Sequence, residues 1–248
     1  MQTAQMLLPD TEKHLVYFQA IGDDQITIYE SEELIWLEIN GIVQSANEKA
    51  FPFRPSLPHC YLILLPLLID KTPQHVLELG GGGLTLQRYI NASHPNVDFT
   101  TVEINQTLVD IVNRYFPQSR PYQVEIDDAK TVISQIETQQ FDWIIFDVFE
   151  GAEIPDGISL TASLSKMWRA VSDQGWLVLN SLEQDKNKMS MMLNALHQLS
   201  GKEPLVLKAQ NYLNHVILMP KNNDFVYPEE LQKENQFTAL TQTSAEAQ

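Results

Sequence analysis

The 248-residue sequence has a single cysteine, Cys60, so no disulfide can form within the chain and a reducing, cytoplasmic compartment is predicted. Basic residues are also scarce, because 16 Lys and Arg face 32 Asp and Glu for a formal net charge of −16. Such a charge repels a phosphate backbone, so nucleic acid is not expected as a partner. It suits a cationic substrate such as a polyamine, although acidity that only maintains solubility explains it at least as well.

Long apolar segments and metal-binding clusters are missing as well. The longest apolar run, Tyr61–Ile69, is too short to span a bilayer, and the opening residues lack the basic and apolar segments of a signal peptide. The six histidines are dispersed along the chain. We therefore predict a cytoplasmic protein with no membrane partner and no metal ion.

The hydrophobic pattern divides the chain into three parts. Residues 1–54 carry short β-type runs and an Asn40-Gly41 turn, typical of a small antiparallel β domain. Residues 55–221 predict an apolar helix near 59–69 and then a Rossmann-like domain, in which buried strands alternate with helices. Residues 222–248 are polar and predict a flexible tail.

The fold class expected for the central part is α/β, with a mostly parallel seven-stranded sheet that ends in an antiparallel strand. No convincing helix separates the last two strands, which predicts a closing antiparallel hairpin. The seven strands are expected at Val76–Leu79, Phe99–Glu103, Tyr122–Ile126, Trp143–Asp147, Trp176–Asn180, Pro204–Ala209 and His215–Met219.

The sharpest local signal is the glycine run Gly80–Gly83, which follows the first of these strands and precedes a helix. Glycines such as Gly80 and Gly82 allow positive φ and let a ligand approach the backbone closely. The start of the following helix adds exposed N–H groups. Ordinary tight turns also use glycine, so the run by itself does not define a site.

Acidic residues follow the next two strands. Glu103, about twenty residues on, is the expected acceptor for the ribose hydroxyls of an adenosine. Asp127 and Asp128 follow the third strand, where a carboxylate can accept from the adenine amino group, but either can instead cap the following helix. Since the carboxyl ends of parallel strands meet at one edge of a sheet, these features predict one adenosine-binding crevice.

The type of nucleoside follows from what the glycine run lacks. Three residues after Gly82, where a dinucleotide fingerprint has its third glycine, the chain has Thr85, and no Lys-Ser/Thr pair of a P-loop follows. Glu78, just before the turn, suits the ammonium group of a methionine-derived ligand. We therefore expect S-adenosylmethionine or its decarboxylated form as co-substrate, in preference to NAD.

The order and spacing of several motifs over residues 25–220 resemble the spermidine synthase family, and more closely its spermidine-synthase-like branch. The resemblance implies an N-terminal β-hairpin domain, a class I methyltransferase-like core and a homodimer. It also implies that Gln44 and Glu103 touch the cofactor and that Asp147 faces the attacking amine. The motifs are Asn40-Gly41-Ile42-Val43-Gln44-Ser45, Leu57-Pro58, the glycine run, Val102-Glu103-Ile104-Asn105, Asp127-Asp128-Ala129, Phe146-Asp147-Val148-Phe149-Glu150-Gly151 with Ile154-Pro155, and Gly175-Trp176-Leu177-Val178-Leu179-Asn180.

Asp147 also has a chemical rationale. Alkyl transfer from a sulfonium needs an unprotonated nucleophile held in line with the carbon under attack. A carboxylate at the end of the fourth strand can accept the proton of an amine or orient the amine. Glu150 extends an acidic rim that could attract a polyamine, although a loop of an acidic protein is often acidic by chance. Asp147 and Glu150 are the predicted catalytic residues.

The chain departs from the spermidine synthase pattern at three places. Asp147-x-x-Glu150-Gly151 stands for Asp-x-x-Asp-Pro, Gly83-Leu84 for the Asp-Gly that ends the glycine turn, and Phe53-Arg54-Pro55 for Tyr-His-Glu. The resemblance implies that those positions help to hold the donor and the polyamine. Three functions therefore stay open: a transferase that moves an aminopropyl group to an amine, an S-adenosylmethionine-dependent methyltransferase, and an inactive nucleoside-binding regulatory protein.

Overall fold

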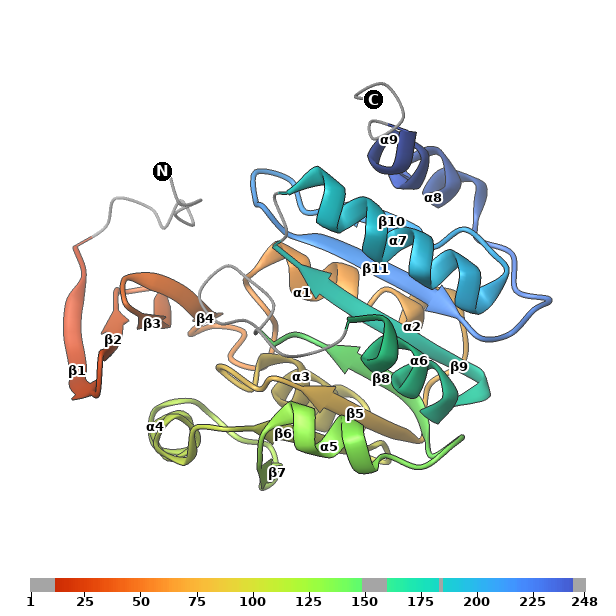
Figure 1. Cartoon of the computed structure of the whole chain (residues 1–248). Helices are drawn as coiled ribbons and strands as arrows, with labels where there is room; N and C mark the ends of the chain where they lie inside the picture. The colour runs from red at the N-terminus through yellow and green to blue at the C-terminus, as the bar shows by residue number, and fades with distance from the viewer. Residues whose placement is uncertain (1–11, 149–159, 183–184, 243–248) are drawn as a thin grey trace.

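The computed structural model describes residues 12–148, 160–182 and 185–242, and Figure 1 shows two sheets. The N-terminal sheet is antiparallel in the order β1-β2-β3-β4. Its Asn40-Gly41 turn has φ values of 53° and 76°, as a two-residue hairpin with this sequence requires. The strands are β1 (His14–Ile21), β2 (Asp24–Glu30), β3 (Leu34–Ile39) and β4 (Ile42–Glu48).

The second sheet has seven strands in the order β10-β11-β9-β8-β5-β6-β7. Neighbours from β9 to β7 are parallel, whereas β11 is antiparallel to both β9 and β10. The predicted fold class is therefore confirmed, and the last strand of the chain lies one place in from the edge. The strands are β5 (His75–Leu79), β6 (Asp98–Glu103), β7 (Gln123–Ile126), β8 (Phe141–Phe146), β9 (Val171–Ser181), β10 (Leu205–Lys208) and β11 (His215–Pro220).

Helices cover both faces of this sheet because its central strands are apolar on both sides. One buried cluster joins Leu77 and Leu79 to α5, α6 and α7, and another joins Val76 to α1 and α3. The apolar helix expected near 59–69 is two short helices, since Pro66 has no N–H to continue the first. These helices are α1 (Pro58–Ile63), α2 (Pro66–Ile69), α3 (Thr85–Ser93), α5 (Ala129–Gln135), α6 (Leu160–Ala170) and α7 (Lys186–Ser200).

Within the described part of the chain, no helix has the length and apolar character needed to cross a membrane.

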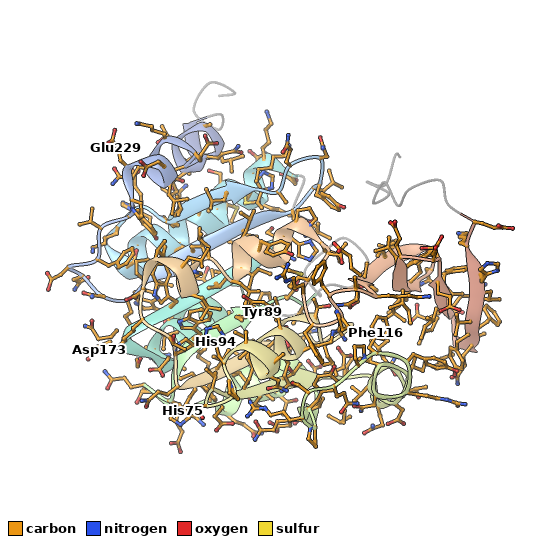
Figure 2. The ribbon with its side chains drawn as sticks, turned by 180° about the vertical axis from the view of Figure 1, so that it is seen from behind. His75, Tyr89, His94, Phe116, Asp173 and Glu229 are labelled. Carbon is orange, nitrogen blue, oxygen red and sulfur yellow. The ribbon has the colours of Figure 1, made fainter. Side chains whose placement is uncertain are left out.

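The N-terminal sheet is joined to the rest of the molecule through α4 (Gln106–Tyr115). Ile28 and Leu37 of the sheet are fully buried against Val112 and Phe116 in one apolar cluster. Figure 2 shows Phe116 between the two sheets. Leu84, directly after the glycine run, belongs to the same cluster, so the N-terminal sheet packs close to this turn.

Residues 225–242 differ from the expected loose tail. They include α8 (Glu229–Lys233) and α9 (Phe237–Gln242), and the buried Phe237 belongs to the main apolar cluster. Phe225 meets Trp176 edge to face, with ring centroids 4.9 Å apart. Widely spaced aromatic residues in a polar segment carry no periodic signal, so the sequence pattern did not reveal this packing.

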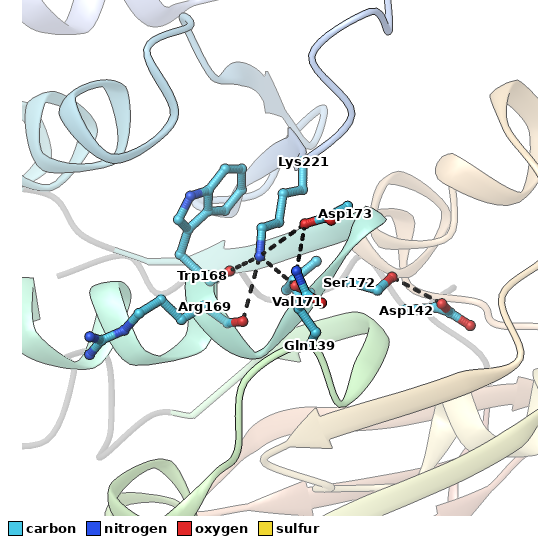
Figure 3. Close-up of polar contacts among 8 residues, drawn as sticks. All are labelled: Gln139, Asp142, Trp168, Arg169, Val171, Ser172, Asp173 and Lys221. Carbon is cyan, nitrogen blue, oxygen red and sulfur yellow. Dashed lines mark hydrogen bonds and ion pairs between the residues drawn. The ribbon is translucent and has the colours of Figure 1, made fainter.

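A lysine side chain contacts backbone oxygens at the C-terminus of α6, next to the start of β9 (Figure 3). The Nζ of Lys221 donates to the backbone oxygens of Val171 at 2.6 Å and Trp168 at 3.1 Å, and lies 4.0 Å from Asp173. Carbonyl groups at a helix C-terminus lack partners within the helix and carry partial negative charge, which a cation satisfies. The cluster is structural, because the predicted site lies at the opposite ends of the strands.

Candidate functional site

The predicted site residues gather where the direction of the chain across the sheet reverses. From β5 the chain proceeds outward to β6 and β7, and then returns to β8 on the other side of β5. At the carboxyl end of β5, the Gly80 N–H donates to Val102 at 2.9 Å, and the Asp147 N–H donates to Leu79 at 2.8 Å. Such a switch point is where α/β sheets open a crevice for ligands.

Gly80 allows the end of β8 to lie directly against the turn. Its φ is 93°, and a Cβ atom there would lie 2.3 Å from the backbone oxygen of Asp147. Gly82 has a φ of 47°, but a Cβ on it would meet no heavy atom within 4 Å. Gly80 therefore serves the packing of the strands, whereas Gly82 borders open space that a ligand can approach.

Glu103 lies beside the turn as predicted, but its carboxylate is already engaged. Oε2 accepts hydrogen bonds from the N–H groups of Gly81 and Gly82, both at 3.0 Å, and Oε1 accepts from Asn105 at 2.9 Å. A carboxylate has about four acceptor positions, so three bonds leave room for a further donor. Glu103 shapes the glycine turn, and its contact with a ribose stays a prediction.

The two aspartates after β7 differ in their contacts. Asp128 Oδ1 accepts from Lys130 N at 2.8 Å, which makes Asp128 the N-cap of α5. Asp127 is half-buried, and its Oδ1 accepts from Asp128 N at 2.7 Å. The capping alternative therefore applies to Asp128, and a contact of Asp127 with an adenine amino group stays a prediction.

Two exposed isoleucines flank these acids and were not singled out from the sequence. Ile104, next to Glu103, is 69% exposed, and Ile126, the register partner of Glu103 in β7, is 41% exposed. Large apolar side chains at the ends of two neighbouring strands offer a surface for a planar base. In the sequence, Ile126 ends an expected strand and Ile104 directly follows one, so only their exposure marks them.

Asp147 is held in place by a side-chain amide. Its Oδ1 accepts a hydrogen bond from Asn180 Nδ2 at 2.8 Å. Burial raises the pKa of Asp147 to about 6, while the bond from Asn180 acts in the opposite direction. The group can therefore gain or lose a proton near neutral pH, as a general base requires. Glu150, the second predicted catalytic residue, lies outside the described residues.

Glu78 is enclosed between β5 and β6. Thr101 Oγ1 donates to its Oε2 at 2.7 Å, and the side chain is buried. Burial raises the pKa of Glu78 well above its usual range, and the charges of Asp147 and Glu103 raise it further, which favours the neutral acid. Its contact with a ligand ammonium stays a prediction. No group of three His, Cys, Asp or Glu side chains in the described residues is arranged to hold a metal ion.

Gln44 lies in a β-bulge of the N-terminal sheet. Leu37 pairs with Ser45 and the next residue, Glu38, pairs with Val43, so Gln44 is the extra residue of β4. Its side chain is half-buried and makes one long bond, 3.4 Å, from Nε2 to the Ile42 oxygen. Bulges re-aim side chains beside functional sites, which supports the expectation that Gln44 reaches a cofactor.

A buried arginine connects this sheet to the glycine turn. Arg88 of α3 is fully buried, and its guanidinium donates to Gly83 O at 3.2 Å, Asn47 Oδ1 at 2.7 Å and Ser45 Oγ at 3.1 Å. Burial lowers the pKa of Arg88, and the nearby Tyr122 opposes this effect. The partners in β4 lie 41 and 43 positions away in sequence, so no local pattern could identify this network.

We expect Gly83→Ala to destabilise the protein and Ser45→Gly to reduce that loss. A Cβ at position 83 would lie 2.1 Å from Ser45 Cβ, and overpacking of this kind costs about 1–3 kcal/mol. Urea unfolding of both single variants and the double variant measures the coupling, expected at about 1 kcal/mol or more in favour of the double variant. Simple additivity of the two changes would contradict the contact between β4 and the turn.

Comparison with known proteins gives the same fold from independent directions. A family model described as "Spermine/spermidine synthase domain" matches residues 57–219. The polyamine aminopropyltransferase of Vibrio vulnificus is 28% identical over 133 residues, which are 52% of this chain and 44% of that protein. The chain thus spans less than half the length of this curated relative.

The chain is also similar to a protein named as a methyltransferase and to a solved structure of a probable spermidine synthase. The eEF1A lysine and N-terminal methyltransferase homolog of Drosophila melanogaster is 28% identical over 134 residues, 50% of this chain and 20% of that protein. A crystal structure of a probable spermidine synthase from Corynebacterium glutamicum has a TM-score of 0.71 at 19% identity, covering 94% of this chain and 86% of that one. At this identity the structural likeness concerns the fold, which includes both sheets.

Proposed function

Since the chain belongs to the spermine/spermidine synthase family, we propose that it is a transferase that moves an aminopropyl group from decarboxylated S-adenosylmethionine to an amine. The observation that carries the proposal is the position of Asp147. Its carboxylate lies at the switch point, its backbone contacts the glycine turn, and Asn180 holds one of its oxygens.

The described residues fit a nucleoside at this edge. Gly82 borders open space, and Glu103 keeps acceptor capacity beside it. Asp127 offers a carboxylate to an amino group, and Ile104 offers an apolar surface to a base. These four residues would hold the ribose and the adenine.

Asp147 would then serve the amine acceptor. A bound sulfonium donor supplies a carbon at which the amine nitrogen forms a C–N bond while the C–S electron pair stays on sulfur. The carboxylate of Asp147 attracts the amine, orients its lone pair and accepts the proton that the product nitrogen releases. With a pKa of about 6, most Asp147 side chains are ionised above neutral pH and can do so.

The charge of the site favours the decarboxylated donor. Glu103, Asp127 and Asp147 place acidic groups at the ends of three strands, where a donor carboxylate would meet like charge. The guanidinium of Arg88 is close to the turn, but it is fully buried and its two terminal nitrogens already donate to Gly83, Ser45 and Asn47. A donor without a carboxylate avoids this repulsion.

Methyl transfer from S-adenosylmethionine is the second candidate. It is favoured by the Drosophila relative named as a methyltransferase, which matches half of this chain. The resemblance also implies that a polyamine is held at the Asp-x-x-Asp-Pro positions, where this chain has Asp147-x-x-Glu150-Gly151. One scaffold can host both reactions, so the donor decides between them.

A calorimetric titration with four ligands tests the proposal: decarboxylated S-adenosylmethionine, S-adenosylmethionine, methylthioadenosine and NAD. We expect the decarboxylated donor to bind at least about tenfold more tightly than S-adenosylmethionine, a difference of about 1.4 kcal/mol. The reverse preference would select methyl transfer. Binding of NAD alone would refute both candidates. Where the decarboxylated donor binds, mass spectrometry of a reaction with putrescine shows whether its aminopropyl group is also transferred.

A further inference from the structure

Two buried asparagines continue the polar contacts of Asp147 into the protein. Asn180 Nδ2 donates to Asp147 Oδ1 at 2.8 Å, and Asn214 Nδ2 donates to Asn180 Oδ1 at 3.0 Å. Both asparagines are buried. A buried amide needs partners for both its donor and its acceptor, and Asn180 has one on each side.

The contacts with Asn214 and with the acceptor-only carboxylate of Asp147 favour the same orientation of the Asn180 amide. Its oxygen lies against the Asn214 amino group, so its own amino group must lie against Asp147. Among the described residues, no side chain donates to Oδ2 of Asp147. The two oxygens of the Asp147 carboxylate therefore differ, because only Oδ1 accepts a hydrogen bond from Asn180.

The antiparallel strand β11 explains how Asn214 reaches this place. Parallel strands end at the site edge, but an antiparallel strand begins there. β11 pairs with β9 so that Val216 lies opposite Asn180, and Asn214 immediately precedes β11. The loop is closed by the Ala209 N–H, which donates to the Asn214 backbone oxygen at 2.9 Å.

We propose that Asn214 and Asn180 form an amide relay that positions Asp147, with Oδ2 directed toward the amine acceptor. The role toward the amine rests on the proposed function, whereas the relay itself does not. Asn180 and Asn214 are positioning residues, and Asn214 acts on Asp147 only through Asn180.

The other ionisable groups near Asp147 do not replace this donor. Glu78 on β5 is buried, with a pKa raised well above its usual range, and its carboxyl group accepts its hydrogen bond from Thr101. Cys60 on α1 is buried, and burial raises the pKa of its thiol, so it stays neutral. The charge of Glu103 raises the pKa of Glu78, and the charge of Arg88 lowers it. The Asn180 bond is the contribution that lowers the pKa of Asp147.

The sharpest test is Asn214→Asp, which changes charge and hydrogen-bonding type at nearly constant shape. A carboxylate at 214 attracts the amino group of Asn180, so the amide turns and presents its oxygen to Asp147. We expect the pKa of Asp147 to rise by at least about one unit, a tenfold change in its proton affinity. The measurement is a ¹³C carboxyl NMR titration of the ligand-free protein, with the resonance assigned by its loss in Asp147→Asn.

Two further variants keep the outcome decisive. Asn194→Asp adds the same charge at a solvent-exposed position of α7 and should leave the Asp147 titration unchanged. A carboxylate at 214 also raises the pKa of Asp147 by direct charge repulsion. Asn214→Ala removes the donor without a charge, so it isolates the relay and should raise the pKa of Asp147 by less, in the same direction. An unchanged titration in a folded variant at 214 would overturn the relay. Absence of transfer by the wild type would refute the proposed function and not the relay.

Discussion

Asp147→Asn is expected to reduce turnover by about 10²- to 10⁴-fold, the usual contribution of a positioned acid–base group, and to leave nucleoside affinity within a few fold. The amide keeps the shape of the carboxylate and can still accept the hydrogen bond from Asn180. It cannot take a proton from an amine or attract an ammonium group. The effect should therefore fall on the reaction and on the amine, not on the nucleoside.

The pH dependence of the wild type should report the same group. The folded protein raises the pKa of Asp147 from 3.8 to about 6, so kcat/KM should decline below pH 6 as Asp147 gains a proton. For stability the sign is opposite. Because the folded state holds this proton more tightly than the unfolded chain, the contribution of Asp147 to stability is full below 3.8 and is lost as the pH rises through about 6.

These two consequences make the variant informative. The amide side chain of Asp147→Asn does not ionise, so this variant should be as stable as the wild type or more stable above pH 6, while it loses turnover. Initial rates and urea unfolding over a pH series measure both properties. The control is Asp173→Asn, because the Asp173 side chain is 72% exposed at the opposite edge of the sheet. Full turnover in Asp147→Asn would remove this residue from the mechanism.

Gly80→Ala is expected to have the largest effect on stability, a loss of about 3 kcal/mol or more. Two costs combine at this position. An alanine is strained at a φ of 93°, and its Cβ would lie 2.3 Å from the backbone oxygen of Asp147, which cannot rotate away. Relief requires the end of β8 to move, so nucleoside binding and turnover should fall together with stability.

Substitutions at two other glycines separate the cost of backbone strain from the cost of the steric clash. Gly22 has a φ of 57° and Gly82 a φ of 47°, and a Cβ on either would meet no heavy atom within 4 Å. Gly22→Ala, in the β1–β2 turn, should cost only about 1 kcal/mol of backbone strain. Gly82→Ala should cost a similar amount but weaken nucleoside binding, because its methyl group would enter the open space beside Glu103. A loss from Gly80→Ala no greater than from Gly22→Ala would contradict the packing of β8 against the turn.

The local sequence pattern was sufficient to predict which strand ends carry the residues of the candidate site. Apolar strands that alternate with helices predict a parallel sheet, and parallel strands bring their carboxyl ends to one edge. The glycine run, Glu103, Asp127 and Asp147 each lie at the end of such a strand, so their convergence could be predicted without coordinates. The Asn40-Gly41 turn was predictable for a similar reason, since few residues tolerate its backbone angles.

The pattern of strands and helices therefore predicted the fold class correctly. It also predicts the edge of the sheet and most of the acidic residues of the candidate site, which stay predictions. The contacts of those residues depend on tertiary packing: Glu103 accepts from the glycine turn, Arg88 connects that turn to β4, and Asn214 donates to Asn180. The physical reason is that strand and helix signals depend on near neighbours in the chain. A buried hydrogen bond between residues 34 or 43 positions apart depends on how separate elements pack, and no local pattern records it.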